Sequence, residues 1–313
     1  MSLRLITDHE IDGEMQLMGE AASIITPLSE FQDAVIAHMD SQPNDSGDKL
    51  PWSKTHDSLR LRPAEISIWT GISGHGKTGF LNQIIGSLLG NCSVVVASLE
   101  MRPEETVLNM IKQVAGCYPS KKFVESWIEA HKYNLWLYDQ TNQVAPERIL
   151  AMARYSSRVL KAKHIVIDSL MKCGLNEDDY NAQKILVDRL AWVAKEFGPH
   201  IHLVAHSRKN ENEYKIPGKF DVSGSASITN LADNVFVVYR NKRREEELEK
   251  KKMGLCFNDG EIAKPATRLK VCKNRHGGAE PMFGFYFHEA SGQFTSSDGK
   301  TLPCNFIPDG ATS

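Results

Sequence analysis

The sequence is poor in the features that define secreted, zinc-stabilised and membrane proteins. Its 313 residues include only six cysteines, scattered along the chain without a Cys-x-x-Cys pair, so neither a disulfide framework nor a zinc ribbon is expected. No apolar run approaches the roughly 18–20 residues that a membrane span requires. The first residues are acidic and lack the basic-then-apolar pattern of a secretory signal. These absences predict a cytoplasmic protein with no membrane partner.

An excess of either charge is also missing. The chain contains 37 Lys and Arg residues against 39 Asp and Glu residues, a net charge of -2, whereas nucleic-acid-binding domains usually carry a basic excess. The average hides an uneven distribution, because residues 1–50 hold two basic and ten acidic residues. The remainder has 35 basic and 29 acidic residues, a net charge of +6. The charge balance therefore does not exclude DNA.

Residues 1–62 are predicted to form an arm, followed by a compact domain over residues 63–295 and a tail over 296–313. Ser29 and Gln32 have the spacing of a helix capping box. An apolar stripe at helical spacing follows from Leu28, Phe31, Val35 and Met39. The segment Ser41–Lys54 is predicted as a linker. Such a helix either folds back on its own domain or docks on a neighbouring subunit, because a lone helix of about three turns is marginal in water.

From Ala64 onwards, short apolar segments alternate with longer helical patterns, which predicts an α/β fold with a mostly parallel, covered sheet. The last two strands are close enough in sequence to form an antiparallel hairpin. The expected strands are Ile66–Thr70, Ser93–Leu99, Leu135–Tyr138, His164–Asp168, Ile201–Ala205, Val235–Tyr239, Leu269–Cys272 and Met282–Phe287. The expected helices are Thr78–Leu89, Glu104–Ala115, Pro146–Leu160 and 181–197.

A phosphate-binding loop follows the first strand and opens the first helix. Residues 71–78 read Gly-Ile-Ser-Gly-His-Gly-Lys-Thr and match G-x-x-x-x-G-K-[ST] in full. The glycines let backbone N–H groups face a phosphate chain, Lys77 reaches the β- and γ-phosphates, and Thr78 offers its hydroxyl to Mg²⁺. The predicted nucleotide-binding residues here are Gly71, Ser73, Gly74, His75, Gly76, Lys77, Thr78 and Gly79.

Two carboxylates at strand ends extend this site. Asp168 ends the apolar segment His164–Asp168 and is predicted as a second Mg²⁺ ligand, although a strand-end Asp taken alone is often a helix cap. Glu100 ends the strand after the phosphate-loop helix. From its position it either polarises the water that attacks the γ-phosphate or serves as a first-turn charge of the next helix.

The ordered set of motifs resembles the hexameric replicative helicases with a RecA-like core, which include the bacterial DnaB helicase, the T7-type phage primase-helicase and the mitochondrial Twinkle helicase. The resemblance covers about residues 60–292, and His206 favours the phage and mitochondrial branch over the bacterial one. The segments that carry it are the phosphate loop, Ser98–Met101, Ile165–Asp168, His202–His206, Gly224–Ala226 and Lys273–Arg275. It implies a RecA-like P-loop NTPase fold with a C-terminal antiparallel hairpin.

This resemblance also implies roles for individual residues. Glu100 would be the general base, and His206 would sense the γ-phosphate, although a histidine after an apolar strand is otherwise a satisfied core residue. Lys273 and Arg275 would reach the neighbouring subunit's ATP site, Arg275 as an arginine finger; the alternative is a solvated basic strand end. The groups that would hold the nucleotide base are Arg240 and Phe287.

Single-stranded DNA is the partner that the resemblance implies, held by two loops, Ser169–Tyr180 and Ser207–Ser223, which face a ring's central channel. The second loop would contact phosphates largely independently of base sequence; the alternative is an exposed mobile loop with ordinary charges. Its basic residues are Arg208, Lys209, Lys215 and Lys219. The charged segment Arg240–Lys252 is interpreted as a solvated helical face and not as a DNA site.

The leading functional hypothesis is a DNA helicase motor, a homo-hexamer or heptamer, which uses ATP, dTTP or another NTP with Mg²⁺ to move along single-stranded DNA. A bacterium or a phage-infected cell is the expected setting, with primase and other replisome proteins as further partners. The first 62 residues are too short for a primase or loader-binding domain, so primase activity is not predicted. The alternatives are a recombinase-like filament ATPase and a nucleotide-switched DNA-binding or loader protein.

Overall fold

The computed structural model describes residues 32–33, 35–36, 46–176, 178–207, 214–222 and 226–297. The chain divides into two units, Met1–Ser46 and Gly47–Ser313. In the first unit, Gln32, Asp33, Val35 and Ile36 are helical; the rest of the predicted amphipathic helix lies outside the described residues. The predicted tail does too, apart from its first two residues.

The segment before the first strand belongs to the second unit, so the domain begins earlier than predicted. Leu50, Trp52, Leu59 and Leu61 are buried, and the Trp52 indole donates a hydrogen bond to the Phe294 carbonyl at 2.7 Å. The expected linker Ser41–Lys54 is therefore wrong in its second half, because Leu50 and Trp52 belong to the core that the later strands build. The boundary lies between Ser46 and Gly47, not after residue 62.

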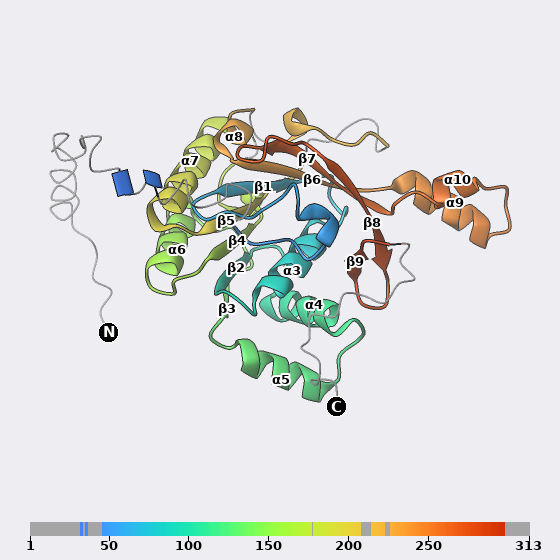
Figure 1. Ribbon diagram of the computed structural model, residues 1–313, viewed down its shortest axis with the longest axis horizontal. Coiled ribbons are helices and arrows are strands. Elements are labelled where there is room, and N and C mark those ends of the chain that lie inside the picture. The colour runs from blue at the N-terminus through green and yellow to red at the C-terminus, as the bar shows by residue number, and fades with distance from the viewer. Residues whose placement is uncertain are drawn as a thin grey trace. The chain divides into compact units, whose positions relative to one another are not determined.

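A nine-stranded sheet organises the second unit, in the order β3-β2-β4-β5-β1-β6-β7-β8-β9 (Figure 1). Neighbouring strands from β3 to β6 run parallel, and those from β6 to β9 run antiparallel. The strands are β1 Ile66–Thr70, β2 Val94–Ser98, β3 Leu135–Leu137, β4 His164–Asp168, β5 His200–Val204, β6 Asn234–Arg240, β7 Thr267–Asn274, β8 Met282–His288 and β9 Gln293–Thr295. The predicted mixed topology is confirmed; the short β9 is an addition.

Helices cover both faces of the sheet (Figure 1). Alternate residues of a strand point to opposite faces, so in β4 Ile165 and Ile167 pack in one core with helices α6 and α7, while Val166 packs in the other with α3 and α4. The helices are α3 Lys77–Leu88, α4 Pro103–Ala115, α5 Lys121–His131, α6 Pro146–Arg158, α7 Tyr180–Phe197, α8 Ala226–Leu231, α9 Lys242–Lys252 and α10 Asp259–Ile262. Strands buried on both faces explain the continuous apolar segments of the sequence.

A row of buried histidines crosses the sheet. The Trp69 indole N–H donates to His202 Nδ1 at 3.1 Å, so a neutral His202 carries its proton on Nε2 and donates to His164 Nδ1 at 3.1 Å. His164 Nε2 in turn lies 3.0 Å from Asp48 Oδ2. Burial lowers the pKa of His200 to about 3 and holds that of His202 well below its ordinary value. The row connects the start of the domain to its central strands, which is a structural role.

Acid is expected to destabilise the domain through this row. An unfolded His200 binds its proton near pH 6.5, whereas the folded one does so only near pH 3, so unfolding takes up a proton between these values. Stability therefore falls as the pH drops below about 6.5, by up to about 1.4 kcal/mol per pH unit and histidine. Urea unfolding between pH 7 and 5 measures the slope. H200Q should make the slope shallower, and equal slopes in the wild type and H200Q would contradict the prediction.

Candidate nucleotide-binding and hydrolysis site

The phosphate loop connects β1 to α3 through backbone conformations that glycine allows. Gly71 has a φ of +145°, and a Cβ there would lie 2.2 Å from the Val238 carbonyl oxygen. Gly76 has a φ of +84° and precedes the first residue of α3. A side chain at Gly71 would collide with β6, and one at Gly76 would strain the turn. The loop geometry therefore requires the glycines that the motif supplies.

Lys77 folds back over the loop that it ends. Its Nζ donates to the carbonyls of Gly71 at 2.9 Å and Ile72 at 3.1 Å. Burial lowers the pKa of Lys77, while the nearby Asp168 and Glu100 carboxylates oppose this effect. The ammonium group is thus held at the mouth of the loop, close to two acidic side chains, where a phosphate chain would displace its carbonyl partners.

Thr78 and Asp168 meet as the motif predicts. The Thr78 hydroxyl donates to Asp168 Oδ2 at 2.6 Å, and burial raises the pKa of Asp168. A hydroxyl and a carboxylate are oxygen ligands that suit Mg²⁺, which commonly takes one or two protein ligands and fills its remaining positions with phosphate oxygens and water. No cluster of three or more His, Cys, Asp or Glu residues that could hold a metal occurs in the described part of the chain. The donor set fits a Mg²⁺ ion that arrives with a nucleotide.

Glu100 lies at the centre of a second polar group beside these residues. It follows β2 and accepts hydrogen bonds from the Ser169 hydroxyl and, at 3.2 Å, from His206 Nε2. The hydrogen bond from His206 is the main cause that lowers the pKa of Glu100 to about 2. The first turn of α4 contains Glu104 and Glu105 and not Glu100. The structure thus brings together Glu100 and His206, which were predicted separately, and adds Ser169.

Ser169 was predicted only as the first residue of a DNA-facing loop, and its contact with Glu100 was missed although a signal was present. It directly follows Asp168, so it had to lie at the same carboxyl edge of the sheet as the metal-ligand candidate. It is fully buried, and its hydroxyl is aimed at the Glu100 carboxylate. The position of Ser169 directly after Asp168 therefore made it a candidate site residue for the same reason as Asp168.

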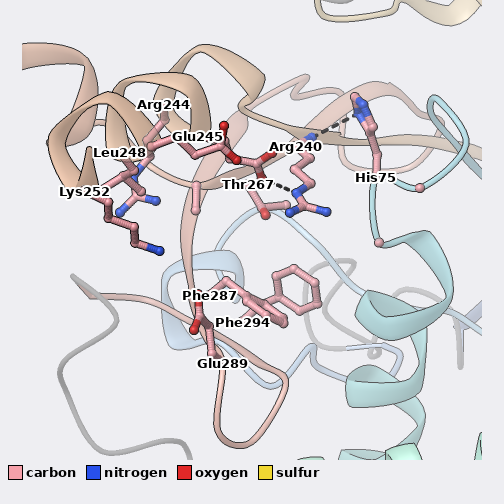
Figure 2. A pocket seen from close by; sticks show the side chains of 14 residues that line it. His75, Arg240, Arg244, Glu245, Leu248, Lys252, Thr267, Phe287, Glu289 and Phe294 are labelled. Carbon is pink, nitrogen blue, oxygen red and sulfur yellow. Dashed lines mark hydrogen bonds and ion pairs between the residues drawn. The ribbon is translucent and has the colours of Figure 1, made fainter. Parts of the chain in front are cut away.

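A cavity of about 340 Å³ opens next to the phosphate loop (Figure 2). Arg240, at the end of β6, and Phe287, on β8, both line it, together with Gly74, His75 and Gly76 of the loop. These are the two residues predicted to hold the nucleotide base. The size and the lining suit a base and sugar extending from phosphates in the loop.

Other residues of the cavity were not predicted. Phe294 of β9 adds a second aromatic ring, and α9 supplies a wall of mixed charge. Figure 2 shows the α9 side chains on one side of the space and the two phenylalanines below it. The α9 residues that line it are Arg244, Glu245, Leu248, Glu249 and Lys252. No residue of α9 is buried, as a solvated face requires, but part of that face borders the cavity.

His75 and Glu245 fix the position of Arg240. The Arg240 backbone N–H donates to His75 Nδ1 at 3.1 Å, so the ring must be unprotonated at that nitrogen. Burial lowers the pKa of His75 to about 4, which keeps the ring neutral near pH 7. Glu245 accepts a hydrogen bond from Arg240 Nε and orients the plane of the guanidinium group over the cavity.

We expect E245Q to raise the nucleotide KM about two- to fivefold with little change in kcat, because the exposed ion pair with Arg240 contributes on the order of 0.5–1 kcal/mol. Steady-state hydrolysis rates over a range of nucleotide concentrations measure both constants. The control is E261Q, which removes a comparable ion pair between Glu261 of α10 and Lys264. An unchanged KM in E245Q would show that Glu245 does not position Arg240.

Lys273 and Arg275 lie at the other end of the sheet from the phosphate loop. The register of the strands shows this position. Asn234 at the start of β6 pairs with Ser67 near the start of β1 and with Asn274 at the end of β7. The phosphate loop follows the opposite end of β1. Arg275 Nη1 lies 2.7 Å from Asp233 Oδ1. Within a single chain the structure does not bring either residue to its own nucleotide site.

Lys273 has partners within its own chain. Its Nζ donates to three carbonyls at the end of α8, those of Thr229 at 3.1 Å, Asn230 at 2.9 Å and Ala232 at 2.6 Å. A cation is favourable at a helix C-terminus. Burial lowers the pKa of Lys273, and the neighbouring Arg275 adds to this effect.

The candidate DNA loop is described in part. Arg208 and Lys209 lie outside the described residues, while Lys215 and Lys219 are exposed. Lys219 Nζ lies 5.2 Å from the ring centre of Phe220, whose side chain is 71% exposed. An exposed aromatic ring beside basic side chains is typical of single-strand binding surfaces, and Phe220 was not among the predicted residues.

Comparison with known proteins gives a consistent result. Residues 59–296 match the family described as DnaB-like helicase C terminal domain. The Twinkle homolog protein, chloroplastic/mitochondrial, of Arabidopsis thaliana is 21% identical over 239 residues, which make up 69% of this chain and 33% of that protein. The chain thus spans about a third of the length of this relative.

Solved structures show the same fold. One of them, an ATPase domain, superposes with a TM-score of 0.69 at 16% identity, over 88% of this chain and 100% of that one. A DnaB-like replicative helicase, whose structure describes its interactions with primase, gives a TM-score of 0.63 at 16% identity, over 87% and 67% of the two chains. No helix in the described part of this chain is long and apolar enough to cross a membrane. With its RecA-like core and a family match over most of its length, the chain belongs to the DnaB-like helicase C-terminal domain family.

Proposed function

We propose that this chain is the motor of a replicative DNA helicase, which hydrolyses ATP or another NTP between the subunits of a ring and moves along single-stranded DNA to unwind a duplex. One observation carries the proposal: the phosphate loop and Glu100 lie at the carboxyl ends of the parallel strands, and Arg275 lies at the opposite end of the sheet. An assembly in which the Arg275 end of one subunit faces the nucleotide site of the next subunit completes every site.

Each group near the phosphate loop has a defined task in hydrolysis. Lys77 binds the β- and γ-phosphates, and Thr78 and Asp168 hold Mg²⁺, which when bound neutralises charge on the phosphates. Glu100 is ionised at neutral pH and takes a proton from the water whose oxygen bonds to the γ-phosphorus while the bond to the leaving β-phosphate oxygen breaks. His206 contacts Glu100 and begins the loop that leads to the DNA, so it senses the nucleotide state.

The proposed finger, Arg275, stabilises the charge that develops on the transferred phosphoryl group. Its side chain is 42% exposed although it pairs with Asp233, so it remains accessible to a neighbouring subunit. A hexamer or heptamer is the assembly that this arrangement supports. Lys273, two residues earlier near the end of β7, is proposed to assist it.

Lys215, Lys219 and the exposed Phe220 support single-stranded DNA as the polymer that the ring encloses. Positive side chains contact phosphates and an aromatic ring stacks on bases without reading their sequence. Primase is a proposed partner, because a structural relative was solved to describe that interaction. The cytoplasm of a bacterium or of a phage-infected cell is the proposed setting.

The test is the rate of ATP hydrolysis against the concentration of single-stranded DNA, with the mass of the oligomer measured in parallel. We expect DNA-stimulated hydrolysis by closed rings and its loss in K77A. Open filaments in electron micrographs would instead support a recombinase-like ATPase. Slow hydrolysis that does not respond to DNA would support a nucleotide-switched loader and contradict the proposal.

A further inference from the structure

Helix α9 lies between the nucleotide cavity and the candidate DNA loop, and its two faces contact different partners. Residues four apart share a helix face. The cavity face is formed by Arg244, Glu245, Leu248, Glu249 and Lys252. Arg243 and Glu246 are three apart and form a second face that does not line the cavity. The helix thus presents one face to each of the two proposed ligand sites.

Tyr214 joins the candidate DNA loop to that second face. Its hydroxyl donates to Glu246 Oε1 at 2.6 Å, and the Arg243 guanidinium lies 5.0 Å from the centre of its ring. Tyr214 directly precedes Lys215 and lies five residues before Lys219, the two described basic residues of the loop. A displacement of Tyr214 would therefore reach α9 through these two contacts.

On the cavity face, Glu245 transmits the position of α9 to the nucleotide site. It holds the Arg240 side chain, and the Arg240 backbone is hydrogen-bonded to His75 of the phosphate loop at 3.1 Å. Glu245 and Glu246 are consecutive residues of one helix, so a displacement of Glu246 also displaces Glu245. The path from Tyr214 to the phosphate loop is a continuous series of contacts.

Helix α9 is held to the domain by polar contacts and not by a buried core. None of its residues is buried, so little packing energy resists a change in its tilt. Polar contacts connect it to α10 and to the turn before α10: Arg244 Nε donates to the Ile262 carbonyl at 3.0 Å, and Glu247 accepts from the Asn258 N–H at 2.7 Å. A stiff helix with a weakly packed surface transmits a displacement instead of absorbing it.

We propose that α9 couples DNA binding to nucleotide binding, with the Tyr214–Glu246 contact as the link and Glu245 with Arg240 as the receiving end. This inference rests on the proposed function, since it assumes that the loop binds single-stranded DNA and the cavity binds a nucleotide. Tyr214 and Glu246 are positioning residues, because they act through Glu245 and Arg240. Coupling of this kind is reciprocal: each ligand changes the affinity for the other by the same factor.

The coupling factor is measured as the ratio of the Kd of a fluorescent oligothymidine with and without a non-hydrolysable ATP analogue, on the assembled protein. Y214F keeps the ring for base stacking and for Arg243 but removes the hydroxyl. E246Q keeps an oxygen that can accept from the hydroxyl but removes the charge that strengthens the hydrogen bond. We expect the factor to fall at least about threefold in each variant. The coupling factor of the double variant should fall no further than that of Y214F alone, because both changes act on one hydrogen bond. Nucleotide affinity without DNA should stay within about twofold of the wild type.

Y118F, at an exposed tyrosine between α4 and α5, is the matched control and should keep the wild-type factor. A wild-type factor in both Y214F and E246Q would overturn the inference. So would a Y214F protein that binds DNA weakly with or without nucleotide while E246Q behaves as the wild type, because Tyr214 would then be a DNA contact only. A wild-type protein that binds no single-stranded DNA would instead contradict the proposed function itself.

Discussion

Replacing Arg275 with alanine is expected to lower the DNA-stimulated rate of ATP hydrolysis by a factor of about 10³–10⁵, the range in which arginine fingers act. Nucleotide binding by the isolated subunit should persist, since Arg275 lies at the sheet edge opposite its own phosphate loop. Turnover assays with saturating DNA, together with equilibrium binding of a fluorescent nucleotide, measure the two effects separately. R275A that retains wild-type stimulated hydrolysis would contradict the assignment.

The substitution also removes the partner of a buried carboxylate, and this needs its own control. Asp233 is 4% exposed, and besides Arg275 it accepts a hydrogen bond from the Ile66 N–H at 2.9 Å. R275K restores a positive charge near Asp233 but lacks the planar fork that grips a phosphoryl group. We expect R275K to recover stability against urea but not hydrolysis.

Mixed rings test whether Arg275 acts across the subunit interface. R275A keeps an intact phosphate loop, and K77A keeps an intact finger, so a ring containing both has some complete sites. Mixing two inactive proteins should therefore restore measurable hydrolysis. The control is a mixture of R275A with a variant that carries both changes, which forms no complete site. Equal activity in the two mixtures would show that the finger does not act in trans.

Local patterns in the sequence predict most of the fold. The strands of the parallel sheet are apolar over their whole length because both faces are covered, and this is visible in single segments such as Val94–Ser98. The short β9 is different: Phe294 exchanges two hydrogen bonds with the side chain of Gln83, at 2.7 and 3.0 Å. Those partners are far away in the sequence. Helix α5 was also missed, although Phe123 and Trp127 recur in it at helical spacing; Trp127 is its only buried residue.

The site divides in the same way. The phosphate loop is predictable because its requirements, such as the glycine at position 71, are met within eight consecutive residues. The contacts of Glu100 with Ser169 and His206 depend on the order of β2, β4 and β5 in the sheet, which no segment encodes alone. The many charged residues of α9 correctly predict that the helix is exposed. They do not predict that Glu245 lies beside the nucleotide cavity, because that position depends on the path of the chain after β6.

Replacing Glu100 with glutamine is expected to lower the rate of hydrolysis by about 10²–10⁴-fold, the contribution typical of a general base, while nucleotide affinity changes little. Glutamine keeps the shape of the side chain and an oxygen to accept from Ser169, but it cannot take a proton from water. The variant should therefore bind ATP and hold it without turnover. Single-turnover hydrolysis and nucleotide retention on the assembled protein measure the two properties.

E104Q is the matched control, because Glu104 occupies the first turn of α4 and its loss affects only the helix dipole. It should hydrolyse ATP at nearly the wild-type rate, and an equal loss in both variants would assign Glu100 a merely structural part. The pH profile gives an independent check. The pKa of Glu100 is lowered to about 2, so the base stays ionised from pH 8 down to pH 5 and its titration contributes no acid limb there. A decline in wild-type kcat over that range that moves to higher pH in S169A, where Glu100 loses a hydrogen bond that lowers its pKa, would place the titration on Glu100 after all.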